Sequence, residues 1–236
     1  MKRIALLIAI VFVAVGGGLL VDVPAPTTVV SVVPVAPVVP ADLDALEVKG
    51  RAPMTGYDRD LFGQRWSDDV RVEGGHNGCD TRNDILRRDL TDPQIRPGTF
   101  GCLVESGTLD DPYSGTPIAF VRGDNQLHID HVVALADAWA KGAQAWDEDT
   151  RRDFANDPLN LLTVDAGLNQ QKGAGDAATW LPPNKAFRCD YAQRIVAVKG
   201  RYGLSVTAAE KDALARELAR CDGSPGMVAG KTGSVS

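Results

Sequence analysis

The sequence carries little positive charge and few aromatic side chains. It has 25 lysine and arginine residues against 31 aspartate and glutamate residues, a formal net charge of −6, and only 6% of its residues are aromatic. A protein that captures nucleic acid by long-range attraction presents a basic surface, so the composition argues against that mode of binding. Local basic clusters or a bound divalent cation could still hold a phosphate.

Histidine is scarce, and no two cysteines have the short C-x-x-C spacing of a structural zinc site. The three histidines are His76, His128 and His131, and none follows position 131. A two-zinc hydrolase of the H-x-H-x-D-H kind would need a further histidine where Gln126 stands, and more ligands downstream. The histidine content therefore argues against that class of enzyme.

The ends of the chain differ in composition from its middle. Lys2 and Arg3 precede an uncharged run over residues 4–21, which is typical of an export signal and is also near the shortest length of a membrane span. Residues 22–45 are rich in proline and valine, which predicts an extended linker. We expect a signal peptide or membrane anchor at 1–21, a folded domain at 46–222 and a disordered tail at 223–236. The protein would then be secreted or anchored on the outer side of the cytoplasmic membrane.

Four cysteines follow the export signal, and an even number in that position favours two disulfide bonds. Cys79, Cys102, Cys189 and Cys221 allow three pairings. The pairs closest in sequence, Cys79 with Cys102 and Cys189 with Cys221, would each close a loop of moderate length. On the loop-entropy argument each bond would stabilise the fold by roughly 3 kcal/mol.

Hydrophobic patterning over the middle of the chain indicates an α+β domain. Apolar residues recur at helical spacing in residues 80–90, and Thr207 with Glu210 forms a capping box that begins a helix over residues 207–220. Further helices are predicted at 134–146 and 166–172, and short strands at 99–104, 118–121, 127–133 and 160–164.

Residues 127–131 read Leu-His-Ile-Asp-His, and an isolated Asp-His pair is most often only the polar end of a strand. Here a second predicted strand opens with Asn160, and a predicted helix carries Asn169 and Lys172. This order resembles the ββα-metal fold of the HNH endonucleases, and is most similar to their secreted branch. The likeness is carried by IDHVVAL (129–135), ANDPLNLL (155–162), RND (82–84), DPYSG (111–115) and WLPP (180–183).

The resemblance implies a role for each residue of the motif. His131 matches the general base that activates water, a task that suits a neutral imidazole. Asp130 and Asn169 match the ligands of one divalent ion, and oxygen ligands favour Mg²⁺ or Mn²⁺. Asn160 matches an asparagine whose amide ties the loop between the strands, and Lys172 is placed to contact a phosphate or the developing charge.

Two more side chains are candidates for substrate binding. On a strand, His128 would share the face of Asp130, while His131 would point to the other face unless the strand ends there. His128 could support the site, contact the substrate or only pack against its neighbours. Arg82 is the arginine expected to contact the substrate, because it falls within the resemblance.

The motif departs from the family pattern in two places. Its final position, 169, is Asn rather than His, and 28 residues separate His131 from Asn160, which predicts an inserted helix. The expected protein is a monomeric, exported endonuclease with a ββα-metal core, added helices and short strands, acting on DNA rather than RNA with little sequence specificity. A metal hydrolase with another substrate and a noncatalytic surface module stay open as alternatives.

Overall fold

The computed structural model describes residues 43–221, and the predicted signal or anchor, most of the linker and the tail lie outside them. The helices are α1 (Thr81–Asp89), α2 (Leu135–Ala140), α3 (Glu148–Asn156), α4 (Ala166–Lys172), α5 (Arg188–Tyr202) and α6 (Ala208–Leu218). The strands are β1 (Leu90–Ile95), β2 (Val104–Asp110), β3 (Pro117–Val121), β4 (Leu127–His131) and β5 (Leu161–Asp165). Short 3-10 helices are η1 (Leu43–Ala45), η2 (Arg59–Phe62), η3 (Ala143–Ala145) and η4 (Lys185–Phe187). The α+β class is confirmed. Every helix within residues 43–221 is too short or too polar to span a bilayer.

The strands form two separate antiparallel sheets. One has the order β1-β2-β3, and the other is the pair β4-β5, in which Asp130 lies opposite Leu162 and His131 opposite Leu161. Helix α4 begins at the residue after β5 and packs against both strands of the pair. Two antiparallel strands and the helix that follows them therefore form one local unit, into which α2 and α3 are inserted between the strands.

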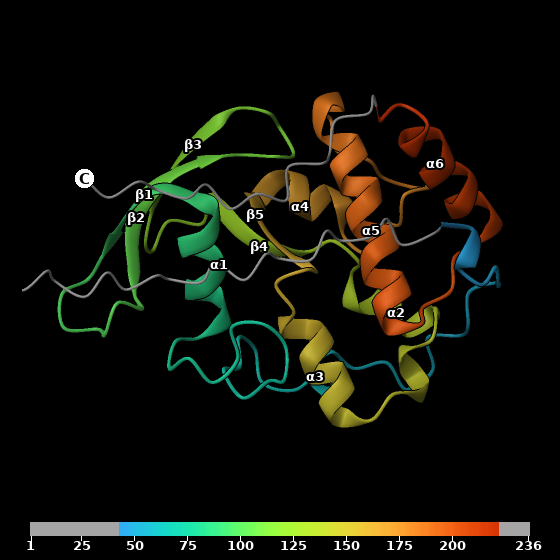
Figure 1. The fold of residues 1–236 in the computed structure, drawn as a ribbon, viewed down its shortest axis with the longest axis horizontal. Coiled ribbons are helices and arrows are strands. Elements are labelled where there is room, and N and C mark those ends of the chain that lie inside the picture. Colours follow the sequence, from blue (N-terminus) through green and yellow to red (C-terminus); the bar gives the residue numbers. More distant parts are fainter. Residues whose placement is uncertain (1–42, 222–236) are drawn as a thin grey trace, which may run out of the picture. The chain divides into compact units, whose positions relative to one another are not determined.

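Two hydrophobic clusters cover the two faces of the β4-β5 pair. Side chains alternate between the two faces along β5. Leu161 packs in the cluster with α1 and the three-stranded sheet, whereas Leu162 and Val164 pack in the cluster with α5 and α6. Figure 1 shows β4 and β5 between these two groups of elements. Leu127 and Ile129 of β4 face the α1 side, so the even-numbered positions of β4 are left for the opposite face.

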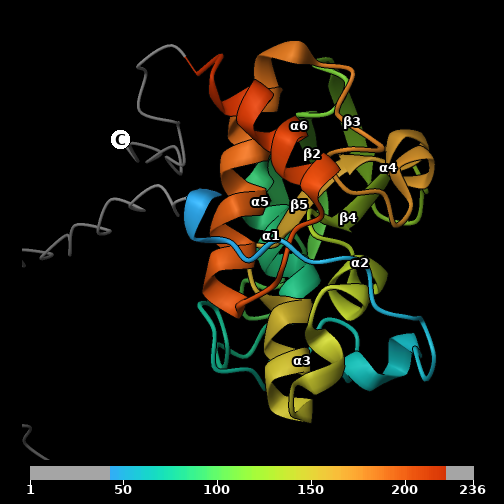
Figure 2. The same cartoon turned by 90° about the vertical axis from the view of Figure 1, so that its right-hand side faces the viewer.

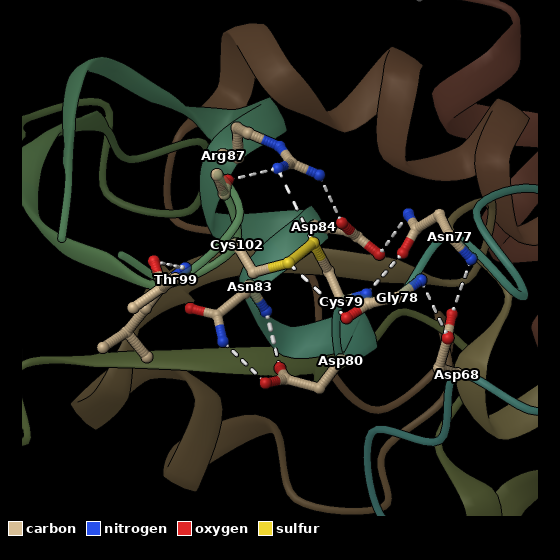
Figure 3. The surroundings of a disulfide bond; sticks show 12 residues. Asp68, Asn77, Gly78, Cys79, Asp80, Asn83, Asp84, Arg87, Thr99 and Cys102 are labelled. Carbon is tan, nitrogen blue, oxygen red and sulfur yellow. Dashed lines mark hydrogen bonds and ion pairs between the residues drawn. A yellow bond between two sulfur atoms is a disulfide. The ribbon is translucent and has the colours of Figure 1, made fainter. Parts of the chain in front are cut away.

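A network of backbone and side-chain contacts fixes the start of α1. The carboxylate of Asp80 accepts a hydrogen bond from the backbone N–H of Asn83 at 2.9 Å and so caps the helix. The carboxylate of Asp68 accepts from the backbone N–H groups of Asn77 and Gly78, each at 3.0 Å. Figure 3 shows these contacts around the disulfide that joins this region to the turn before β2.

Two disulfide bonds are present, as the even cysteine count predicted, and the described residues contain no free cysteine. Cys79 pairs with Cys102, and Cys189 at the start of α5 pairs with Cys221 after α6. The first bond anchors α1 to the three-stranded sheet, and the second holds α5 and α6 together at one end.

A buried ionic cluster joins five segments on the side of α5 and α6. Its members are Arg51, Asp137 of α2, Lys141, Asp176, Lys199 of α5 and Glu210 of α6. The ammonium of Lys141 lies 2.8 Å from carboxylate oxygens of Asp137 and Asp176 and 2.7 Å from one of Glu210. Three positive and three negative charges balance, which is the condition under which buried charges are tolerated.

The strand predicted at 99–104 is wrong. Residues 99–102 form a turn, and β2 begins only at Val104. The turn is required because Phe100 and Gly101 both have positive φ, at 54° and 81°, and the Cys102 N–H returns to the Thr99 carbonyl. The apolar residues in this stretch do not alternate across a sheet.

The predicted helix at 134–146 is shorter than expected. Helix α2 ends at Ala140, and Gly142, with φ 142°, separates it from η3. Helices α3 and α5 were not predicted. The predictions for α1, α4 and α6 and for the strands β3, β4 and β5 are confirmed within a few residues.

Candidate active site

One cleft collects most of the residues that the sequence singles out. It has a volume of about 350 Å³, and its lining includes His128, Asp130 and His131 of β4 and Asn169 of α4. These side chains come together because β4 lies beside β5 and α4 folds back on both strands immediately after β5. Arg59 of η2 lies on the same lining, although no sequence motif singled it out.

Asp130 is a buried carboxylate that already has two partners. Its side chain is on the face of β4 away from α1, where the Tyr113 hydroxyl donates to Oδ2 at 2.5 Å. The ammonium of Lys172 lies 3.0 Å from Oδ1 and 2.9 Å from Oδ2. Burial and the charge of Asp130 raise the pKa of Tyr113 well above its ordinary value, so Tyr113 stays protonated and acts as a hydrogen-bond donor.

Lys172, the last residue of α4, points into the protein. Its side chain is fully buried, and its ammonium also donates to the backbone carbonyl of His131 at 2.7 Å. One lysine therefore connects the end of α4 to two consecutive residues of β4. The ammonium compensates the charge of Asp130, which would otherwise be costly to bury.

His131 is the last residue of β4, and its imidazole faces a different environment from Asp130. Its ring stacks on Trp66, with centroids 6.3 Å apart and planes inclined by 10°, and its Nε2 lies 2.8 Å from the Ala155 carbonyl. A carbonyl only accepts hydrogen bonds, so Nε2 carries the proton and Nδ1 keeps a lone pair in the neutral ring.

The surroundings keep this imidazole neutral. Burial lowers the pKa of His131 from 6.5 to about 4; the hydrogen bond to Ala155 opposes the shift, and the charges of Arg59 and Lys172 add to it. At neutral pH the ring is therefore available as a proton acceptor.

Asn160 lies in the turn that enters β5 and is completely buried. Its side-chain oxygen accepts from the Val133 N–H at 2.8 Å, and its amide nitrogen donates to the Val133 carbonyl at 3.2 Å. Its backbone carbonyl accepts from Val132 at 2.8 Å. These bonds tie the chain just after His131 to the start of β5.

His128 and Asn169 meet across the cleft. The amide nitrogen of Asn169 lies 3.4 Å from Nδ1 of His128, and both side chains are half-buried. His128 shares the even-numbered face of β4 with Asp130, as the alternation along the strand predicts.

The donor set of the cleft fits one divalent cation with oxygen ligands. Oδ1 of Asp130 has one hydrogen bond, from Lys172, and a carboxylate oxygen has two lone pairs, so one remains for a cation. Asn169 lines the same cleft, and its side-chain amide supplies a further oxygen that can act as a ligand. Carboxylate and amide oxygens are the ligands that Mg²⁺ and Mn²⁺ accept. Residues 43–221 contain no cluster of three or more His, Cys, Asp or Glu side chains suited to a metal.

Arg82 is not brought to the cleft lining. It lies in the first turn of α1, where burial and the charge of Arg122 lower its pKa. The helix start is linked to the site indirectly, since the Thr81 N–H donates to the carbonyl of Trp66, whose ring stacks on His131.

Three contacts of the site were not identified from the sequence. Tyr113 lies within the DPYSG stretch, which carried part of the resemblance, but its bond to Asp130 could not be read from spacing. Trp66 and Arg59 precede the motif by more than sixty positions, and only folding brings them to His131.

Comparison with known proteins identifies a family for this chain. The family described as "GmrSD restriction endonucleases, C-terminal domain" matches residues 80–217, more than half of the chain and all of β4, β5 and α4. An "Uncharacterized secreted protein" of Arthroderma benhamiae is 37% identical over 200 residues, which cover 84% of this chain and 92% of that protein. No solved structure matches the chain. The chain therefore belongs to the family of the C-terminal domain of GmrSD restriction endonucleases, a nuclease family.

Proposed function

We propose that the protein is a secreted, divalent-metal-dependent endonuclease that hydrolyses phosphodiester bonds of DNA with little sequence specificity, through a ββα-metal core made of β4, β5 and α4. The observation that carries this proposal is the meeting of Asp130, His131 and Asn169 on one cleft lining. The name of the Arthroderma benhamiae relative and the two disulfides support secretion.

In this mechanism His131 is the general base. Its Nε2 proton is committed to the Ala155 carbonyl, so Nδ1 is the atom that takes a proton from the attacking water. The stacked ring of Trp66 and the hydrogen bond to Ala155 hold the imidazole in one orientation. This preorganisation matters because a general base acts only within hydrogen-bond reach of the proton it accepts.

Asp130 and Asn169 would hold the cation. A divalent ion bound there would polarise the scissile phosphate and stabilise the leaving oxygen. Hydrogen bonds from Tyr113 and Lys172 orient the Asp130 carboxylate. Asn160 holds the turn after His131 against β5. We assign Lys172 and Asn160 to positioning, since both side chains are buried and their partners lie within the protein.

The test uses the full chain produced under oxidising conditions, so that both disulfides form. Supercoiled plasmid is incubated with Mg²⁺, Mn²⁺, Ca²⁺ or Zn²⁺ and with a chelator, beside His131→Ala and the control His76→Ala, whose histidine is exposed in a loop. We expect cutting with Mg²⁺ or Mn²⁺, none with chelator, and a loss of at least about 100-fold in His131→Ala only. Equal cutting by His131→Ala would disprove the assignment of the base.

A further inference from the structure

Most arginines in residues 43–221 are satisfied within the protein. Their guanidinium groups bond to carboxylates or to backbone carbonyls, as for Arg71 with Asp153 and Arg188 with the Pro182 carbonyl. Over this part of the chain, the arginines without such a partner are Arg59, Arg65, Arg82 and Arg216. The protein has a net charge of −6. The positions of these unpaired guanidinium groups therefore indicate where it could bind an anion.

Two of the four lie beside the proposed base. Arg59 and Arg65 line a second, smaller hollow that is also lined by His131 and Trp66. Arg59 lines the large cleft as well, so it stands where the two hollows meet at His131. Both arginines are exposed, whereas Arg216 lies on α6, away from either lining.

The segment that carries the two arginines is firmly held. Helix η2 begins at Arg59 and packs against α2 and α3 (Figure 2). The Asp58 carboxylate caps it and accepts from the Asp60 N–H at 2.9 Å. The Leu61 carbonyl accepts from Arg151 at 3.0 Å. The backbone at Arg59 is thus anchored, and next to Arg65 the Trp66 carbonyl accepts from the Thr81 N–H at 3.3 Å. Both arginine side chains stay exposed.

We propose that Arg59 and Arg65 form a phosphate-binding strip that holds the nucleic-acid backbone alongside His131. The proposal rests on the proposed nuclease function. It identifies which side chains of a chain with an acidic composition bind the phosphates of a nucleic acid. Arginine suits the task because its planar fork pairs with two phosphate oxygens and stays charged. The lining also contains the acidic Asp60, and its positive charge comes from the two arginines.

The strip makes a quantitative prediction for salt dependence. Each phosphate contact that is lost lowers the slope of log affinity against log salt concentration by about 0.9 for duplex DNA. We expect Arg59→Gln and Arg65→Gln each to lower the slope by about that amount and to weaken binding several-fold at low salt. Arg59→Lys keeps the charge and should keep most of the slope.

Binding of the full chain to a fluorescent DNA duplex is measured by anisotropy in EDTA, where no metal-dependent cutting can occur, over a series of NaCl concentrations. The matched control is Arg216→Gln, which removes the same charge from another unpaired, exposed arginine. An unchanged slope in Arg59→Gln and Arg65→Gln, or an equal fall in Arg216→Gln, would overturn the strip. Plasmid cutting by the parent protein with Mn²⁺ is scored separately, so a failure of the nuclease function is distinguished from a failure of the strip.

Discussion

Replacement of Lys172 by methionine removes a buried charge while keeping most of the side-chain volume. In the wild-type protein the ammonium is within 3.0 Å of both Asp130 oxygens and 2.7 Å from the His131 carbonyl. Without it, the Asp130 carboxylate keeps only the Tyr113 hydroxyl as a partner. Breaking a buried pair by removing one member typically costs about 3–5 kcal/mol, so we expect the free energy of unfolding to fall by about that amount.

The same change should strengthen cation binding. A positive charge about 4 Å from another costs about 4 kcal/mol at an effective dielectric constant of 20, and Lys172 imposes a repulsion of this kind on any cation at Asp130. A cation can also replace the missing ammonium as the partner of the carboxylate. We expect the affinity for Mn²⁺ to rise at least about tenfold, and stability to recover by about 2.7 kcal/mol at a Mn²⁺ concentration 100 times the dissociation constant.

Urea unfolding at pH 7, in EDTA and across a Mn²⁺ titration, measures both effects. The control is Lys185→Met, because Lys185 is an exposed lysine of η4 without an ion pair in the described residues. A loss below about 1 kcal/mol in EDTA would refute the argument from buried charge. An equal gain from Mn²⁺ in Lys172→Met, Lys185→Met and wild type would refute the placement of the cation at Asp130.

Three further changes test the supports of the site. Asn160→Ala leaves the Val133 N–H without its acceptor, so we expect a stability loss of about 1–3 kcal/mol and, in kinetic assays, a fall in kcat with little change in KM. Lys141→Met leaves the buried ionic cluster with one excess negative charge, and calorimetry should show that the free energy of unfolding falls by about 3–5 kcal/mol. Adding Asp176→Asn to this variant removes the excess charge and should partly restore stability. Replacing Cys79 and Cys102 together by serine opens a loop with a sequence separation of 23. The free energy of unfolding in urea should fall by about 3 kcal/mol, and reductant should no longer lower stability through this bond. An unchanged free energy of unfolding would contradict the proposed contribution of the loop.

Local predictions succeeded where one short segment contains all the information. The capping box at Thr207 predicted α6, and the Thr207 hydroxyl accepts from the Glu210 N–H at 3.1 Å as that motif requires. Alternation predicted that His128 and Asp130 share a face of β4, and Leu127 and Ile129 pack into the hydrophobic cluster on the opposite face. Both kinds of prediction depend on backbone geometry within a few residues.

Local predictions failed where distant packing chooses the conformation. The apolar stretch before Val104 has the composition of a strand, yet the disulfide at Cys102 and the positive φ of Phe100 place it in a turn. No strand was predicted at β1, where Pro93 lies between Thr91 and Gln94 and the register with β2 shifts. A proline cannot donate to the ladder, so this strand depends on its partner rather than on its own propensity.

The sequence by itself determined the order of the motif along the chain, the α+β class and the number of disulfide bonds, because these follow from residue spacing, short-range periodicity and the cysteine count. The sequence left three cysteine pairings open, and the fold decided between them. Only the tertiary structure decided that Lys172 turns inward to Asp130, 42 positions away, that Tyr113 and Trp66 support the two motif residues, and that Arg59 and Arg65 stand free beside His131. The charge state and partner of a side chain depend on which distant segments surround it, and that is settled only when the hydrophobic clusters on both faces of the β4-β5 pair are packed.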